Sequence, residues 1–195
     1  MTMPHTNLHV SPFIARFAPL IPAHAHVLDL AAGSGRHARL LAARGARVLA
    51  VDRDPVALAA SAGVPGIETR VLDLETGRWP LAGEVFDAIV VVNYLHRPLF
   101  PHLRAALAAD GVILYETFAA GNQQFGRPTN PDFLLRDGEL LEFACAPPLP
   151  LTVVTFEQGR DDVGDRSVVV ARLAAVGPAY RGPPILPPEI PARQG

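Results

Sequence analysis

The chain of 195 residues contains no lysine, and its 17 Lys-or-Arg positions are all arginine. This absence excludes a P-loop lysine, a pyridoxal Schiff base and an amine nucleophile. A single cysteine, Cys145, excludes a disulfide framework and a zinc site built from cysteines. We interpret Cys145 as a small buried residue. His24 and His26 lie on one face of an expected strand, but two histidines without further ligands do not indicate a metal site, and we predict none.

The sequence also lacks a run of about 20 apolar residues, the length that a membrane span needs. Its start, MTMPHTNLHV, has no basic segment followed by an apolar run and so does not resemble a signal peptide. The net charge is −2, which gives no general reason to bind nucleic acid or an acidic membrane. We therefore expect a cytoplasmic protein, as monomer or homodimer. Its abundant Ala, Arg, Gly and Pro suggest a GC-rich bacterial genome.

What is present is an alternation of apolar strands and amphipathic segments. Strands are predicted at residues 26–30, 47–51, 67–72, 86–92 and 112–118, and helices at 12–21, 36–44, 55–61 and 98–109. Such alternation favours right-handed βαβ units and a parallel sheet. Two further strand-like runs, 151–157 and 167–174, are joined by QGRDDVGDR, which is too short for a crossover helix. These two strands must be antiparallel.

The predicted fold is therefore α/β: a Rossmann-like, seven-stranded, mostly parallel sheet with a C-terminal antiparallel hairpin and helices on both faces. Residues 1–25 form an N-terminal segment with a short helix, and residues 26–176 form the main domain. The remaining 177–195 hold six prolines and are expected to be an extended or disordered tail.

The stretch VLDLAAGSG runs from an apolar strand into the turn Gly33-Ser34-Gly35, and a helix follows. Such a turn lets a polar ligand approach the backbone closely. Asp52 ends the second strand, where its carboxylate can accept both hydroxyl hydrogens of a ribose. Asp73 ends the third strand and is placed to face an adenine amino group. Parallel strands bring these carboxylates to one edge of the sheet, where open α/β sheets bind ligands.

The spacing of GSGRHA also satisfies the dinucleotide pattern G-x-G-x-x-G/A, so a nicotinamide-binding oxidoreductase is an alternative. Three features count against it. Asp29 lies near the end of the first strand, where a pyrophosphate would make a carboxylate unfavourable. The terminal hairpin is not part of the standard dinucleotide fold, and the chain has little room for a substrate domain. Asp29 instead suits a cationic ligand, such as a sulfonium that carries an α-amino group.

Residues 10–175 resemble the class I S-adenosylmethionine-dependent methyltransferases. The segments VLDLAAGSG, AVDRD, VLDLE and FDAIVVVNYLH look like the first four motifs of that family, although the usual first glycine is Ala31 here. Within the family, Tyr115–Leu140 is similar to small bacterial enzymes related to the tellurite-resistance group. The resemblance implies S-adenosylmethionine as the cofactor. It places Asp29 near the methionine amino group, Asp52 on the ribose, and Asp73 with Leu74 beside the adenine. The remaining cofactor residues that it implies are Ala31, Gly33, Ser34, Gly35, Arg53, Asn93 and Tyr94.

The acceptor must be held about 3 Å from the methyl carbon, and a general base is needed only if the acceptor must lose a proton. We take His96, which follows the fourth strand, and Tyr115 and Glu116, near the end of the fifth, as catalytic candidates. Tyr115 and Glu116 face opposite sides of a strand, so at most one points at a common pocket. The polar segment 119–131 is a candidate lid.

The fourth motif reads Asn93-Tyr94-Leu95-His96, without the Asn/Asp-Pro-Pro-aromatic pattern of enzymes that methylate nucleic-acid amines. Together with the lack of a basic patch, this favours a small-molecule acceptor and no nucleic-acid partner. A non-catalytic S-adenosylmethionine-binding regulatory module is a second alternative.

Overall fold

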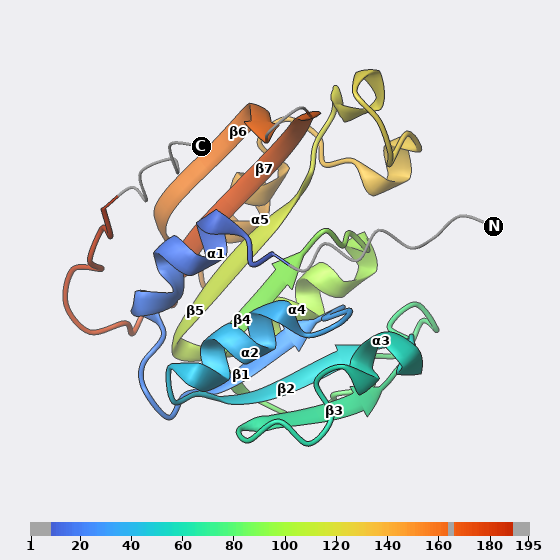
Figure 1. Cartoon of the computed structure of the whole chain (residues 1–195). Coiled ribbons are helices and arrows are strands. Elements are labelled where there is room, and N and C mark those ends of the chain that lie inside the picture. The colour runs from blue at the N-terminus through green and yellow to red at the C-terminus, as the bar shows by residue number, and fades with distance from the viewer. Residues whose placement is uncertain (1–8, 164–165, 189–195) are drawn as a thin grey trace.

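Seven strands form one sheet in the order β3-β2-β1-β4-β5-β7-β6 (Figure 1). The structure, a computed structural model, describes residues 9–163 and 166–188. The strands are β1 (His26–Leu30), β2 (Arg47–Asp52), β3 (Ile67–Val71), β4 (Phe86–Val92), β5 (Leu107–Phe118), β6 (Thr152–Val163) and β7 (Arg166–Val176). Strands β1 to β5 are parallel, and β7 is antiparallel to both β5 and β6. The predicted sheet, with its reversed hairpin, is confirmed.

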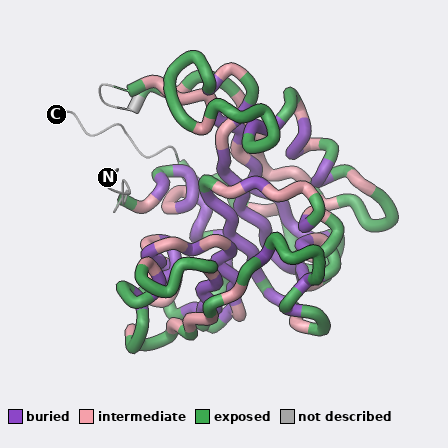
Figure 2. The backbone as a smooth tube through the Cα atoms, turned by 90° about the vertical axis from the view of Figure 1, so that its right-hand side faces the viewer, coloured by how far each residue is buried: buried purple, intermediate pink, exposed green. Residues whose placement is uncertain are grey.

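Helices cover both faces of this sheet, as predicted. They are α1 (Pro12–Phe17), α2 (Arg36–Ala43), α3 (Pro55–Ala59), α4 (Phe100–Ala106) and α5 (Glu139–Cys145), with single 3₁₀ turns η1 (Ala18–Leu20), η2 (Arg97–Leu99), η3 (Asn122–Gln124) and η4 (Pro131–Phe133). Buried residues of α1, α2 and α3 belong to one apolar cluster, and those of α4 and α5 belong to another. Alternate side chains of the central strands point into each cluster, so β1, β4 and β5 are buried on both sides (Figure 2).

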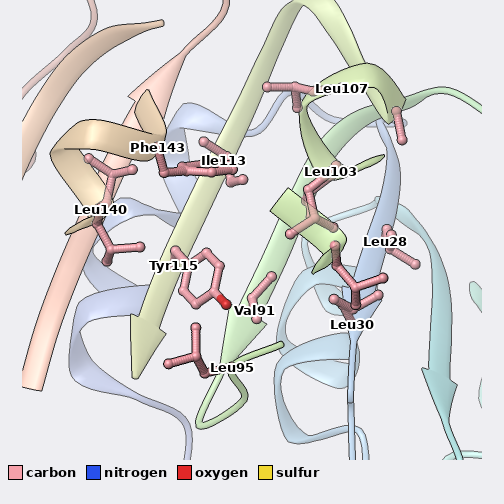
Figure 3. Close-up of a cluster of buried hydrophobic side chains, with 14 of the residues drawn as sticks. Leu28, Leu30, Val91, Leu95, Leu103, Leu107, Ile113, Tyr115, Leu140 and Phe143 are labelled. Atoms are coloured by element: carbon pink, nitrogen blue, oxygen red, sulfur yellow. The ribbon is translucent and has the colours of Figure 1, made fainter. Parts of the chain in front are cut away.

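The cluster beneath α4 and α5 shows how the sheet is held. Leu28, Val91 and Ile113 come from three neighbouring strands, and Leu103 of α4 and Phe143 of α5 lie over them (Figure 3). All five side chains are buried. Burying a side chain of this size contributes about 1.5–3 kcal/mol, so the two layers are held together mainly by apolar contact.

The helix ends follow the expected capping chemistry. Ser11 Oγ accepts a hydrogen bond from Ile14 N at the start of α1, and Asp54 accepts from Val56 N and Ala57 N at the start of α3. A proline occupies the first position of both helices, where its missing N–H costs nothing. Gly45, with φ of +93°, follows the end of α2, as predicted.

Two boundaries were predicted wrongly. The helix expected at 98–109 ends at Ala106, and Leu107 begins β5, because Leu107 pairs with Phe86 of β4. Residues 108–111 form an irregularity, and the pairing resumes at Ala88 and Val112. Gly111 is closely packed at this irregularity, because an added Cβ would lie 3.0 Å from the carbonyl oxygen of Ala108 and 3.1 Å from that of Asp87. The polar residues 158–163 were expected to form a turn. They continue β6 instead, since the hairpin pairs as far as Val163 and Arg166.

The proline-rich segment after β7 contains no helix or strand between residues 177 and 188. It contacts the domain nonetheless. Gly177 N and Ala179 N donate to the carbonyl oxygens of Gly111 and Ala109, and Arg16 Nε donates to Pro187 O. The rest of the predicted tail, 189–195, and the first part of the N-terminal segment, 1–8, lie outside the described residues. The division at 25 and 176 stays a prediction.

Candidate active site

A pocket of about 480 Å³ opens at the carboxyl edge of the sheet. This is the edge where parallel α/β sheets bind ligands, because the loops after the strands meet there. Its 14 lining residues lie at or after the carboxyl ends of β1 to β5. They are Ala31, Asp52, Arg53, Leu72, Asp73, Leu74, Glu75, Asn93, Tyr94, Leu95, Thr117, Phe118, Pro128 and Phe133.

Seven of the eleven predicted cofactor residues line this pocket together. They are Ala31, Asp52, Arg53, Asp73, Leu74, Asn93 and Tyr94. The structure therefore brings together residues from four loops that are far apart in the sequence. Asp29, Gly33, Ser34 and Gly35 do not line the pocket themselves, and each has a different place behind or beside it.

The glycine turn is fixed by the carboxylate of Asp52. Gly33 N donates to Asp52 Oδ2 at 2.7 Å, and Asp54 N donates to Asp52 Oδ1 at 2.9 Å. Gly33 has φ of +56°, and a Cβ added there would meet no atom within 4 Å. The backbone of the turn is thus open to a ligand on the side where other residues carry a side chain.

Ser34 and Gly35 serve packing behind the turn. The carbonyl oxygen of Ser34 accepts from Ser61 Oγ at 2.8 Å and from Arg39 at 2.6 Å. Gly35 has φ of +72°, and an added Cβ would lie 2.2 Å from Ser61 Oγ. A glycine is required here because both the backbone angle and the space forbid a side chain.

Two residues with a strained, left-handed backbone conformation line the pocket. Of the three non-glycine residues with positive φ in the described chain, Ala31 (+54°) and Asn93 (+57°) both line it. Each such conformation costs on the order of 1–3 kcal/mol and persists only where the surrounding structure imposes it. Ala31 therefore holds a left-handed backbone conformation that glycine adopts more readily.

Asp29 is buried at 1% exposure behind the pocket, where its Oδ2 accepts from Ala38 N at 2.9 Å. It thereby caps the first turn of α2. Burial raises the pKa of Asp29 to about 7, although the bond from Ala38 and the charge of Arg36 oppose the shift. Its predicted place beside the methionine amino group stays a prediction.

This burial makes a pH-dependent prediction. The folded pKa of Asp29 lies above the value of the unfolded chain, so its contribution to stability is complete below about pH 4 and is lost as the pH rises through about 7. Compared with the wild type, Asp29→Asn should therefore gain about 2–4 kcal/mol of unfolding free energy between about pH 5 and about pH 8. Urea unfolding of both proteins across this range measures the difference. If the difference in unfolding free energy between the two proteins does not change with pH, the pKa of Asp29 is not raised in the folded protein.

Asp73 and Glu75 form a second acidic corner of the pocket. Glu75 N donates to Asp73 Oδ1 at 2.9 Å, which shapes the turn after β3. Tyr94 Oη donates to Glu75 Oε1 at 3.4 Å, and Tyr115 Oη donates to the Tyr94 carbonyl at 3.0 Å. Burial, followed by the nearby carboxylates, raises the pKa of the Tyr94 hydroxyl, which stays protonated.

The three catalytic candidates lie outside the pocket lining. Tyr115 is 1% exposed, and burial raises the pKa of its hydroxyl, so it is a core residue that supports Tyr94 (Figure 3). Glu116 is also buried and accepts from Arg172 Nε at 2.7 Å. His96 directly precedes η2. The structure does not bring these three side chains together, and their catalytic roles stay predictions.

A polar network around Glu116 could not be read from the sequence. Ser11 Oγ donates to Glu116 Oε2 at 3.1 Å, while Ser11 N donates to His37 Nε2 at 3.2 Å. Burial, together with the charge of Arg36, lowers the pKa of His37 to about 3, which keeps it neutral and able to accept this bond. The network joins α1 to the beginning of α2 and to β5. No sequence signal links residues 11, 37, 116 and 172.

The segment after β5 contributes to the pocket, as its role as a candidate lid requires. Pro128 and Phe133 line the pocket, whereas Phe125 does not and lies beside Arg160 instead. Asn122, 1% exposed, fixes the base of the segment, since Val169 N donates to its Oδ1 and its own Nδ2 donates to Pro128 O. Whether this segment closes over a substrate stays a prediction.

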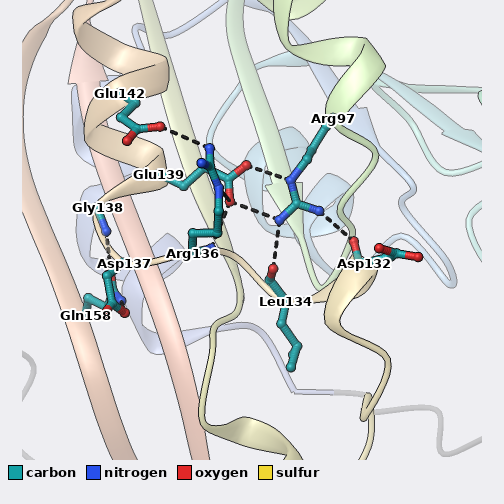
Figure 4. Close-up of polar contacts among 9 residues, drawn as sticks. All are labelled: Arg97, Asp132, Leu134, Arg136, Asp137, Gly138, Glu139, Glu142 and Gln158. Carbon is teal, nitrogen blue, oxygen red and sulfur yellow. Dashed lines mark hydrogen bonds and ion pairs between the residues drawn. The ribbon is translucent and has the colours of Figure 1, made fainter.

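Arg97 holds the far end of that segment in place. Its guanidinium donates to the carbonyl oxygens of Asp132 and Leu134, both at 2.8 Å, and pairs with Glu139 at 2.7 Å (Figure 4). Burial alone would raise the pKa of Glu139, but the bonds from Arg97 and Arg136 outweigh it and hold that pKa below its usual value.

Cys145, at the end of α5, is exposed, so its predicted burial was wrong.

The described residues contain no group of three or more His, Cys, Asp or Glu side chains arranged to hold a metal. None of their helices has both the length and the apolar character to cross a membrane.

The sheet order, with its antiparallel β7, is that of the class I methyltransferase fold. Comparisons agree: residues 27–111, somewhat less than half of the chain, match the family described as "Methyltransferase domain". Over these residues the chain is therefore similar to a methyltransferase domain. The search of curated proteins gives no match.

Solved structures with the same fold include TehB from Haemophilus influenzae, with a TM-score of 0.73 and 18% identity over 89% of this chain. This chain spans 64% of TehB. A TehB-like S-adenosylmethionine-dependent methyltransferase from Corynebacterium glutamicum has a TM-score of 0.60 and 23% identity, with 85% of this chain and 88% of that one covered. The N-methyltransferase NodS from Bradyrhizobium japonicum, in complex with S-adenosylhomocysteine, has a TM-score of 0.63 and 19% identity, with 83% of each chain covered.

Proposed function

We propose that this protein transfers the methyl group of S-adenosylmethionine to a small-molecule acceptor. The observation that carries the proposal is the position of Asp52: it fixes the open glycine turn through Gly33 and at the same time lines the pocket. A carboxylate in this position suits the two ribose hydroxyls of a nucleoside. S-adenosylmethionine, when bound, supplies a methyl group already activated by a positively charged sulfur.

The residues present fit this cofactor. The open backbone at Gly33 and the left-handed Ala31 leave room for close approach. In this proposal Asp73 and Leu74 would border the adenine, and Asn93 and Tyr94 would line the methionine side; all four line the pocket. With this division, the chain's own work is to orient the cofactor, hold the acceptor in line and exclude water.

The charge of the lining favours a small acceptor over nucleic acid. Three carboxylates, those of Asp52, Asp73 and Glu75, face one guanidinium, that of Arg53. A polyanionic backbone would be repelled at such an opening, since nucleic-acid sites are built from basic side chains.

We further propose that the protein acts in the cytoplasm and that it is a monomer or homodimer. Size-exclusion chromatography with light scattering would establish the oligomeric state.

A nicotinamide-dependent oxidoreductase fits this geometry less well. Asp29 already caps the first turn of α2 with its carboxyl group, on the helix end that would otherwise hold a diphosphate. The antiparallel β7 is also foreign to the standard dinucleotide fold. Only a measurement of activity distinguishes an enzyme from a regulatory module that binds the cofactor without turnover.

Calorimetric titration tests the proposal. We expect S-adenosylhomocysteine and S-adenosylmethionine to bind with a stoichiometry of about one per chain, and NADH not to bind. NADH fluorescence during a parallel titration provides the control. A folded protein that binds NADH but neither sulfur nucleoside would reject the proposal.

A further inference from the structure

Besides carboxylates, the pocket contains apolar and aromatic side chains. Leu95, Phe118, Pro128 and Phe133 line it, and the ring of Tyr94 borders it. Phe133 is a large apolar side chain that remains 51% exposed on η4. An exposed aromatic ring at the mouth of a pocket offers a flat apolar surface on which another ring can stack.

Charge narrows the choice of acceptor. Among the described lining residues, Arg53 is the single cation against the three carboxylates Asp52, Asp73 and Glu75. The net negative charge of this lining disfavours an anionic acceptor but does not repel a neutral one. During transfer the positive charge moves from the sulfur to the acceptor, and an acidic lining stabilises this charge wherever it develops.

The proton-accepting groups of the lining restrict the choice of acceptor further. No histidine, cysteine or lysine is among the described lining residues. Asp52 and Asp73 accept backbone hydrogen bonds, and Glu75 accepts one from the Tyr94 hydroxyl, which its raised pKa keeps protonated. An alcohol, a phenol or a protonated aliphatic amine needs a base before it attacks, and this lining does not position one. The acceptor must therefore carry a free lone pair at neutral pH.

We propose that the acceptor is an uncharged, planar aromatic molecule that attacks through a nitrogen lone pair, either a ring nitrogen or an aromatic amine. This inference rests on the proposed function. The nitrogen lone pair forms the new N–C bond while the S–C bond breaks, and its electrons remain on sulfur. A ring nitrogen becomes a cation and loses no proton, whereas an aromatic amine releases one proton to water afterwards.

Quinoline and quinoline-4-carboxylate make a matched pair of probes, since they differ by one carboxylate. We expect the protein loaded with S-adenosylhomocysteine to bind quinoline at least tenfold more tightly than its carboxylate, and the protein loaded with S-adenosylmethionine to form N-methylquinolinium, detected by mass spectrometry. If S-adenosylhomocysteine itself fails to bind, the proposed function fails. If it binds and quinoline is neither bound nor methylated, or its carboxylate is preferred, this inference alone is overturned.

Phe133→Ala and Phe125→Ala test the stacking surface. Both rings are exposed and lie on the same segment, but only Phe133 lines the pocket. We expect Phe133→Ala to raise the dissociation constant of quinoline about tenfold and to leave that of S-adenosylhomocysteine unchanged. Phe125→Ala should change neither constant. Equal effects of the two substitutions, or no effect of Phe133→Ala, would show that Phe133 does not contact the acceptor.

Discussion

Asp52→Ala should raise the dissociation constant of S-adenosylhomocysteine by about two orders of magnitude, which corresponds to about 2–4 kcal/mol. Two effects add up. The variant loses the carboxylate that we assign to the ribose hydroxyls, and Gly33 N loses its acceptor at 2.7 Å, so the glycine turn is no longer held. Isothermal titration calorimetry measures the affinity directly.

Asp54→Ala is the matched control, because it removes the same charge two residues further on. The carboxylate of Asp54 turns away to Val56 N and Ala57 N, where it caps α3. This variant should lose about 1 kcal/mol of unfolding free energy and keep its affinity for S-adenosylhomocysteine. An unchanged affinity of Asp52→Ala, or an equal loss in both variants, would contradict the role of Asp52.

The second large effect is expected at Gly35, where substitution by alanine should lower the free energy of unfolding by about 2–5 kcal/mol. The new Cβ would lie 2.2 Å from Ser61 Oγ and 2.9 Å from Ser61 Cβ. Ser61 has no exposed surface and donates to Ser34 O, so it cannot move without breaking the turn. Urea unfolding followed by circular dichroism gives the change.

Gly33→Ala separates crowding from backbone strain. Gly33 shares a positive φ with Gly35, but its added Cβ would meet nothing within 4 Å. This control should therefore cost only the left-handed backbone, about 1 kcal/mol of unfolding free energy. Equal losses in the two variants would show that the contact with Ser61 is unimportant.

The fold could be predicted from the sequence because its strands are short, apolar and separated by strong turn signals. Residues 86–92 form β4 with the predicted bounds, and the polar link at 158–166 correctly indicated antiparallel pairing. Residues 107–110 were assigned wrongly, because Ala108 and Ala109 are good helix formers. Their strand conformation depends on partners distant in sequence, such as Ala179, whose N donates to the carbonyl oxygen of Ala109.

The candidate site, like the fold, could be predicted only in part from the sequence. Asp52, Asp73 and Asn93 lie at or just after the carboxyl ends of parallel strands, so parallel pairing alone predicts that they meet. The acceptor side depends on Phe133 and on the bonds from Arg97 to the η4 region, which no local pattern encodes. Tyr115 illustrates the limit: alternation placed its side chain on one face of β5, but only packing shows that this face is closed core.

Ser11 has a consequence for where the foldable unit begins. The matched methyltransferase segment starts at Val27, yet Ser11 supplies a donor to His37 and another to Glu116, two buried side chains on different elements. Starting the chain at Val27 would leave both acceptors without these partners and would remove Phe13, Ile14 and Phe17 of α1 from the apolar cluster to which they belong. The smallest autonomous piece of this protein therefore extends at least to Ser11, sixteen residues upstream of the family boundary.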